Sequence, residues 1–233
     1  NVFLLFRNND NNIRNSYIAK SNNAGLIFTE TEDIDDLNWV LNSCPTSSAV
    51  GAVNGDSIMV VRRNGGSGIN ELYKSNVNMN DLQKSYFLKV DESGGPLQDK
   101  AEISTVNNYF VAIWQENRNG LKECLYNISD NNGSSIYNGI ISDTNTFGHK
   151  IEPDISYVDG VRFAITYTAS TQQEVHFVFA SLSDLVSVSQ INNKDRRIAK
   201  SVDLLGKKII PEKNKPFINI YDNGSNERII IIE

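Results

Sequence analysis

The residue types that most often carry catalytic chemistry are scarce in this chain. Its 233 residues include only two histidines, His149 and His176. Neither has cysteines or carboxylates at the spacing of a zinc site. The sequence also lacks a Gly-x-Ser-x-Gly nucleophile elbow and a phosphate-binding glycine loop. We therefore predict no catalytic residue, no metal site and no cofactor.

Two cysteines and three sequons are candidates for covalent modification. Two cysteines do not make a disulfide framework, so we expect Cys44 and Cys124 to be free and buried, with a bridge between them as the alternative. Asn127, Asn132 and Asn223 each begin an Asn-x-Ser sequon. They are candidate glycosylation sites if the chain enters a eukaryotic secretory pathway.

Carboxylates offer the remaining chemistry. Glycoside hydrolysis uses two carboxyl groups held at a set separation, which only the fold determines. Glu116, Glu152, Asp154 and Asp159 lie near the ends of predicted strands and are the acids to inspect for such a pair. The acidic stretch at residues 30–36 is expected to be a solvated loop, with a divalent cation or a basic partner as the alternative.

Composition excludes several partner classes. The net charge is −6 and the pI is about 5.0, which argues against nucleic acid and against anionic membrane surfaces as partners. No apolar run reaches the roughly 18 residues of a membrane span. The one basic stretch, residues 194–215, is expected to be a solvated loop, with an acidic partner surface as the alternative. We expect a single domain over residues 1–233. Because the chain begins without Met, we also expect it to be a segment of a longer one.

The elements that position these side chains form a repeat. Four segments each combine a short strand, a turn and a more apolar strand. Successive turns are 53, 52 and 64 residues apart. Asn-Gly and Asp-Gly pairs favour type I′ hairpin turns, in which both central residues have positive φ. The turn pairs are Asn54-Gly55, Asn107-Asn108, Asp159-Gly160 and Asn223-Gly224.

Each repeat continues with a third strand and a looser fourth strand, expected at residues 86–90, 135–142 and 186–191. The second strand is the most apolar, as expected of a strand buried on both faces. Helical patterns are scarce, with single turns expected at residues 33–41 and 80–84. The sequence therefore predicts an all-β fold, a β-propeller of four-stranded antiparallel blades with four to five blades. Strands from the two ends are expected to share a blade, although one strand is then left over.

Two segments carry a family resemblance. Residues 153–167 read Pro-Asp-Ile-Ser-Tyr-Val-Asp-Gly-Val-Arg-Phe-Ala-Ile-Thr-Tyr, and residues 109–116 read Tyr-Phe-Val-Ala-Ile-Trp-Gln-Glu. This pattern resembles the propeller-like repeats of large secreted and cell-surface proteins. The resemblance implies the fold and an extracellular or surface location, and it implies no enzymatic activity. The WD40 pair, the sialidase Asp-box and the integrin-type calcium loop are all missing from the sequence.

Three functions follow as hypotheses. The first is a non-enzymatic structural or interaction module of an extracellular, surface or filament assembly, with protein partners or neighbouring subunits and with glycan as a further ligand. The alternative is a carbohydrate-binding or glycoside-processing propeller, favoured if carboxylates and an aromatic residue converge on a central funnel. An intracellular scaffold is favoured if both cysteines are free and the sequons carry no glycan.

Overall fold

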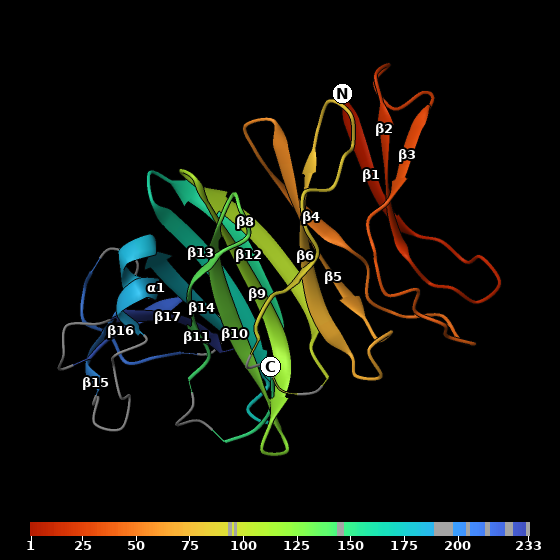
Figure 1. The fold of residues 1–233 in the computed structure, drawn as a ribbon. Coiled ribbons are helices and arrows are strands. Elements are labelled where there is room, and N and C mark those ends of the chain that lie inside the picture. The colour runs from red at the N-terminus through yellow and green to blue at the C-terminus, as the bar shows by residue number, and fades with distance from the viewer. Residues whose placement is uncertain are drawn as a thin grey trace.

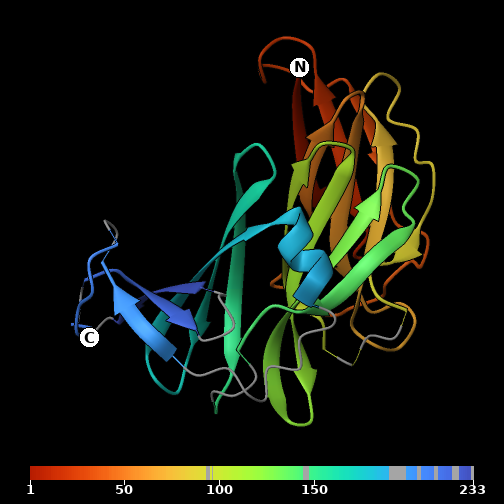
Figure 2. The same cartoon turned by 90° about the vertical axis from the view of Figure 1, so that its left-hand side faces the viewer.

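The computed structural model describes residues 1–92, 95, 97–143, 147–188, 198–203, 206–212, 215–221 and 226–231. Within these ranges the protein is all-β, with four antiparallel sheets and one short helix. The sheets follow one another in chain order across the molecule (Figure 1), and in the turned view of Figure 2 the fourth sheet lies to one side of the other three. We refer to them as the first to fourth sheets.

The first three sheets are each built from consecutive strands. The first has the order β1-β2-β3, the second β4-β5-β6-β7, and the third β11-β10-β9-β8. Their bounds are β1 Val2–Arg7, β2 Ser16–Ser21, β3 Glu30–Asp33, β4 Val50–Asn54, β5 Ser57–Asn64, β6 Glu71–Asn78, β7 Leu88–Lys89, β8 Asp99–Val106, β9 Tyr109–Arg118, β10 Leu121–Asp130 and β11 Ser135–Ile140. The predicted four-stranded antiparallel unit is thus confirmed in the second and third sheets.

The fourth sheet is larger and has the order β12-β13-β14-β17-β16-β15. Helix α1 follows β14 and precedes β15 in the chain. The bounds are β12 Lys150–Asp159, β13 Arg162–Ala169, β14 Glu174–Ser181, α1 Leu182–Val188, β15 Ile198–Val202, β16 Phe217–Tyr221 and β17 Asn226–Ile231. Here β17 pairs with β14 at the edge where a looser fourth strand was expected.

The repeat is marked by turns with one shared backbone feature. Two-residue turns join β4 to β5, β8 to β9 and β12 to β13. The first turn residue has positive φ in each case, at 60° for Gly55, 52° for Asn107 and 52° for Gly160. The second turn residue does not have positive φ, so the expected type I′ geometry, which needs two positive φ values, is wrong. Where Gly opens the turn, the Asn or Asp before it is the last residue of the preceding strand.

Three hydrophobic cores lie between the four sheets. Successive residues of a strand point to opposite faces, so each inner sheet contributes to two cores. Ile58 and Val60 of β5 pack toward the first sheet, whereas Val61 packs toward the third. On β9, Trp114 belongs to the core with the second sheet, and Ile113 belongs to the core with the fourth. The cores therefore tie each sheet to its neighbours in chain order.

Burial of the second strands follows from this stacking. In β5 and β9 an unbroken run of residues is buried, as predicted for strands covered on both faces. In β1 and β13 more exposed positions alternate with more buried ones. The first and fourth sheets stand at the ends of the row, so one face of each has no further sheet among the described residues.

Several sequence-based expectations are corrected. Residues 186–191 were expected to form a strand, but residues 186–188 belong to α1 and the remainder lies outside the described residues. Residues 33–41 and 80–84 contain no helix. The C-terminal strands β16 and β17 extend the fourth sheet and do not pair with β1, so strands from the two ends share no sheet in the described structure.

Candidate functional site

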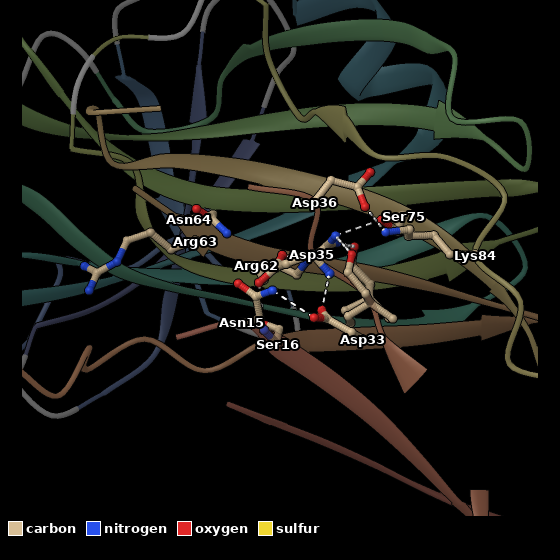
Figure 3. A network of polar contacts seen from close by, with 12 residues as sticks. Asn15, Ser16, Asp33, Asp35, Asp36, Arg62, Arg63, Asn64, Ser75 and Lys84 are labelled. Atoms are coloured by element: carbon tan, nitrogen blue, oxygen red, sulfur yellow. Dashed lines mark hydrogen bonds and ion pairs between the residues drawn. The ribbon is translucent and has the colours of Figure 1, made fainter. Parts of the chain in front are cut away.

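Polar side chains gather where neighbouring sheets meet. One group forms a buried network between the first and second sheets (Figure 3). A second group lines a cleft between the second and third sheets. The two groups are connected through adjacent residues of β5, Arg62 and Arg63.

Arg62 is the centre of the buried network. Its side chain is fully buried, and its Nε lies 2.5 Å from Oδ1 of Asp35, which is also fully buried. The guanidinium also donates to Ser75 Oγ at 2.8 Å and to the carbonyl of Ile34, and it lies over the ring of Phe87. Burial lowers the pKa of Arg62, and the neighbouring Asp35 carboxylate opposes that effect.

The acidic stretch supplies the other half of this network. Asp35 Oδ2 accepts the backbone N–H of Ser16 at 2.7 Å, and Asp33 accepts from Asn15 at 2.8 Å. Asp36 pairs with Lys84. The expected solvated loop over residues 30–36 is therefore wrong. Residues 30–33 form β3, and the Asp35 carboxylate is the counterion of a buried arginine that links two sheets. All of these partners belong to the chain itself, so the network has a structural role.

Arg62 also orients its neighbour. Side chains alternate along a strand, so anchoring Arg62 against the first sheet directs Arg63 to the other face of β5. In Figure 3 the Arg63 side chain extends away from the Arg62–Asp35 pair. There Arg63 lies 2.9 Å from Asp99 of β8 and 5.7 Å from the centre of the Trp39 ring. Ser47 also donates to Asp99.

The cleft beside Arg63 has a volume of about 180 Å³. It lies where the end of β5 and the start of β6 meet β8, β9 and β10. Its lining combines two cations, three amides, one carboxylate and one apolar side chain. These residues are Arg63, Asn70, Leu97, Gln98, Asp99, Gln115 and Lys122.

Two of the lining amides are held by bonds to other elements. Gln98 accepts the N–H of Leu72 at 2.7 Å and donates to Glu116 at 2.8 Å. The side-chain oxygen of Gln115 accepts the N–H of Glu152 at 3.0 Å. The Nε2 group of Gln115 is therefore the one that can donate to a ligand in the cleft. Lys122 is exposed and has no side-chain partner among the described residues. The cleft thus presents two fixed amides beside a cation that has no side-chain partner in the described part of the chain.

The lining of the cleft supplies positive charge and hydrogen-bonding groups. Its lining contains no serine, cysteine or histidine that could act as a nucleophile or general base. It does contain guanidinium, ammonium and amide donors, which recognise carboxylates and hydroxyl groups. These residues form no sequence motif, because they come from four strands, β5, β8, β9 and β10, and from the loops beside them.

The four candidate acids differ in burial and in their partners. Glu116 is fully buried and accepts hydrogen bonds from Gln98, Trp114 Nε1 at 3.1 Å, Arg118 at 2.8 Å and the backbone N–H of Gly95 at 2.7 Å. Such a carboxylate is a structural acceptor. Glu152 and Asp154 are exposed on β12, and exposed Asp159 pairs with Arg162 across a hairpin.

Glu102 is an acid that the sequence analysis missed. Burial raises its pKa, and Asp154 on the adjacent sheet raises it further. Glu102 and Asp154 occupy equivalent repeat positions, since Glu102 pairs with Ile113 on β9 and Asp154 pairs with Thr166 on β13. The signal was the repeated acidic-Ile-Ser sequence, which places both acids on first strands.

The two histidines have different partners within the protein. His149 accepts the N–H of Lys122, and His176 is buried against Tyr167. Both cysteines are free, so the alternative Cys44–Cys124 bridge is not formed, and Cys124 is buried as expected. The expected burial of Cys44 is wrong, because this residue is exposed.

Two of the three sequon asparagines lie within the described residues. Asn127 is fully buried and accepts from Lys74 at 3.2 Å, so a glycan there would require its side chain to leave the interior. Asn132 is exposed in the turn between β10 and β11, and Asn223 lies outside the described residues.

Comparison with known proteins by sequence identifies no family for this chain. No protein-family model matches it, and no curated protein matches it as a relative. In the described part of the chain, no three His, Cys, Asp or Glu residues group to hold a metal ion. None of the helices described is long and apolar enough to cross a membrane.

Proposed function

We propose that this chain is a non-enzymatic interaction module of a multi-chain assembly, and that it associates with a second copy of itself through β1. The observation that carries the proposal is the open edge of this strand. The equivalent second strands β5, β9 and β13 each have a partner on both sides. β1 pairs only with β2 among the described residues.

The backbone groups on the open edge can be identified from the strand register. The N–H of Asn8 bonds the carbonyl of Asn15, next to the pair Arg7 and Ser16. Hydrogen-bonded and non-hydrogen-bonded pairs alternate in an antiparallel ladder. The N–H and C=O groups of Phe3 and Leu5 therefore point away from β2 and can pair with another strand.

The edge lacks the features that prevent pairing. Proteins commonly protect exposed edge strands with charges, prolines or bulges. Residues 2–6 have none of these, and Val2 and Leu4 are 40% and 47% exposed. The nearby loop adds Leu26 and Ile27, which are 83% and 60% exposed. A partner that pairs with β1 would cover apolar surface as well as backbone groups.

A second copy fits this edge. Two β1 strands related by a two-fold axis would be antiparallel, so each could satisfy the outward groups of the other. Arg7, the only charged residue of the strand, would then lie at opposite ends of the pair and would not oppose its own copy. The result would be one continuous sheet of six strands across the two copies.

The arrangement of the sheets and the location of the protein are further parts of the proposal. We propose that the sheets are propeller-type blades, because the first strands β4, β8 and β12 contact one another in succession. An extracellular or surface location is supported by the resemblance of the repeats and by the exposed sequon at Asn132. Two free thiols favour the intracellular alternative.

Sedimentation velocity over a range of protein concentrations tests self-association. We expect the unmodified chain to form a dimer that the double variant Val2→Lys, Leu4→Lys reduces to monomer, because charge repels a second edge and the substituted side chains are already exposed. Ile210→Lys, at a position 85% exposed on another part of the surface, should leave the dimer unchanged. The proposal would be refuted if the unmodified chain stayed monomeric at every concentration, or if the double variant formed the dimer as readily as the unmodified chain.

A further inference from the structure

We propose that the cleft between the second and third sheets binds a small hydroxylated carboxylate, of the chemical class of sugar acids. This site is independent of self-association through β1. The cleft is formed by loops and strand ends of the second and third sheets, and its lining includes no residue of the first sheet. The inference rests on the charge, hydrogen-bonding groups, rigidity and size of that cleft.

The charge of the lining favours an anion. Arg63 and Lys122 are positive and Asp99 is negative, so the formal charge of the lining is positive. Asp99 is already engaged by Arg63 at 2.9 Å and by the Ser47 hydroxyl. Lys122 has no such partner among the described residues, and its ammonium is the group best able to bind a ligand carboxylate.

The amides favour hydroxyl groups elsewhere on the ligand. Gln115 is 4% exposed, and its carbonyl oxygen is already occupied by the N–H of Glu152. Its NH₂ group remains as a donor. Asn70 has both a donor and an acceptor on its side chain, and no side-chain hydrogen bond of Asn70 is formed among the described residues. A hydroxyl group both donates and accepts hydrogen bonds, so it can bind to the side-chain amides of Gln115 and Asn70.

The binding groups are held in place before a ligand arrives. Arg63 is fixed between the Asp99 carboxylate and the face of Trp39, and Trp39 itself is 6% exposed. Gln98 and Gln115 are each anchored to another strand or loop. Little side-chain freedom would be lost on binding, which favours affinity in a small site.

The size of the cleft limits the ligand. The cleft volume of about 180 Å³ is below the roughly 300–1,000 Å³ of pockets that hold drug-sized ligands, so the cleft suits a single small ligand such as one sugar ring. Leu97, which is 54% exposed, offers an apolar contact for the C–H groups of such a ring.

Isothermal titration calorimetry with glucuronate and glucose tests this site in the full chain. We expect saturable binding of glucuronate, and binding of glucose weaker by about tenfold, because glucose cannot use the charge of Lys122. Lys122→Met should weaken glucuronate binding about tenfold and leave the weaker binding of glucose nearly unchanged. Lys207→Met, which removes an exposed ammonium near the fourth sheet, is the matched control and should change neither ligand.

A second variant tests the amide without removing its structural bond. Gln115→Glu keeps an oxygen acceptor for the Glu152 N–H but replaces the free amide with negative charge, so glucuronate binding should be lost. A far-UV circular dichroism spectrum identical to that of the unmodified chain would show that the fold is kept. No heat of binding with glucuronate at millimolar concentrations, equal affinity for glucose and glucuronate, or unchanged glucuronate affinity in Lys122→Met would each overturn the inference.

Discussion

Lys74 is a buried ammonium surrounded by neutral acceptors. Its side chain on β6 is almost fully buried between the second and third sheets. Nζ donates to Asn127 Oδ1 at 3.2 Å, Ser129 Oγ at 3.3 Å and Ser135 Oγ at 2.9 Å. Among the described residues no carboxylate contacts Nζ directly, although Asp130 lies near enough to oppose the effect of burial on the pKa. Burial lowers the pKa of Lys74 from 10.5 to about 8.

This lowered pKa makes the stability of the protein depend on pH in a defined direction. Between about pH 8 and pH 10.5 the unfolded chain holds the Lys74 proton while the folded chain releases it. The free energy of unfolding should therefore rise with pH in that window, relative to Lys74→Met, with a limiting slope of about 1.4 kcal/mol per pH unit. Below pH 8 the difference in the free energy of unfolding between the unmodified protein and Lys74→Met should be constant.

Urea unfolding of both proteins at several pH values measures this difference. Lys208→Met, which removes an exposed lysine, serves as the control and should show no such slope against the unmodified chain. If the difference between the unmodified protein and Lys74→Met stays flat from pH 7.5 to 10, the ammonium is not buried as described.

The partners of buried charged side chains were the part of the structure that the sequence predicted least well. The sequence places Arg62 directly after an apolar run and Lys74 in a mixed polar and apolar strand, but it does not show which oxygens face them. Asp35 is separated from Arg62 by 27 residues, and the contact forms only when the first two sheets pack. The same limit explains why the cleft around Arg63 and Lys122 was missed.

At the scale of elements, the turns were the most reliable signal. Gly55, Asn107 and Gly160 share a positive φ because each opens a two-residue turn at the same repeat position. Gly and Asn adopt that conformation at lower cost than other residues. This local preference is visible in the sequence, so the hairpins could be predicted even though the turn type was wrong.

Gly55→Ala isolates this backbone effect. A Cβ at Gly55 would meet no atom within 4 Å, so the cost is conformational and not steric. We expect the free energy of unfolding to fall by about 1 kcal/mol. Urea denaturation should show a lower midpoint with an unchanged slope. Asp56→Ala, at the exposed second turn residue, should have a much smaller effect, and comparable losses in both variants would contradict the argument.

Helix α1 shows why the end of the repeat was harder to predict. Ser181 and Asp184 form reciprocal hydrogen bonds at its start, with Ser181 N to Asp184 Oδ2 at 2.7 Å and Asp184 N to Ser181 Oγ at 3.2 Å. This capping box was present in the sequence. The repeat pattern favoured a strand there, but Leu185 packs into the core between the third and fourth sheets, and β17 takes the sheet edge instead.

At the scale of the whole molecule, each pair of adjacent sheets is joined by an apolar core and by polar links. Lys20 on β2 reaches the carbonyl of Asn80 at 2.6 Å, and Lys74 on β6 reaches the third sheet. Tyr126 on β10 donates to the carbonyl of Leu185 in α1. Lys74 and Tyr126 occupy equivalent third-strand positions, since each lies opposite the fifth residue of its second strand. Each sheet is therefore stabilised chiefly by its immediate neighbours.

The stability of the first sheet should accordingly depend on Arg62. Arg62→Met removes the cation and leaves Asp35 as an uncompensated buried charge, a change that typically costs about 3–5 kcal/mol. Because Asp35 follows β3 and holds the N–H of Ser16 at the start of β2, the loss should be local. Hydrogen exchange measured by mass spectrometry should speed up in β1 to β3, with much smaller changes in β9 and β13.

Two further variants separate the charge effect from general destabilisation. Combining Arg62→Met with Asp35→Asn should recover part of the lost protection, because the asparagine carries no charge and can still accept from Ser16. Arg162→Met removes an exposed arginine from a surface pair with Asp159, and such pairs contribute little to stability, so it should leave exchange unchanged. Faster exchange spread evenly over all four sheets in Arg62→Met would mean that the row of sheets unfolds as one unit, and that Arg62 does not act locally at the interface between the first two sheets.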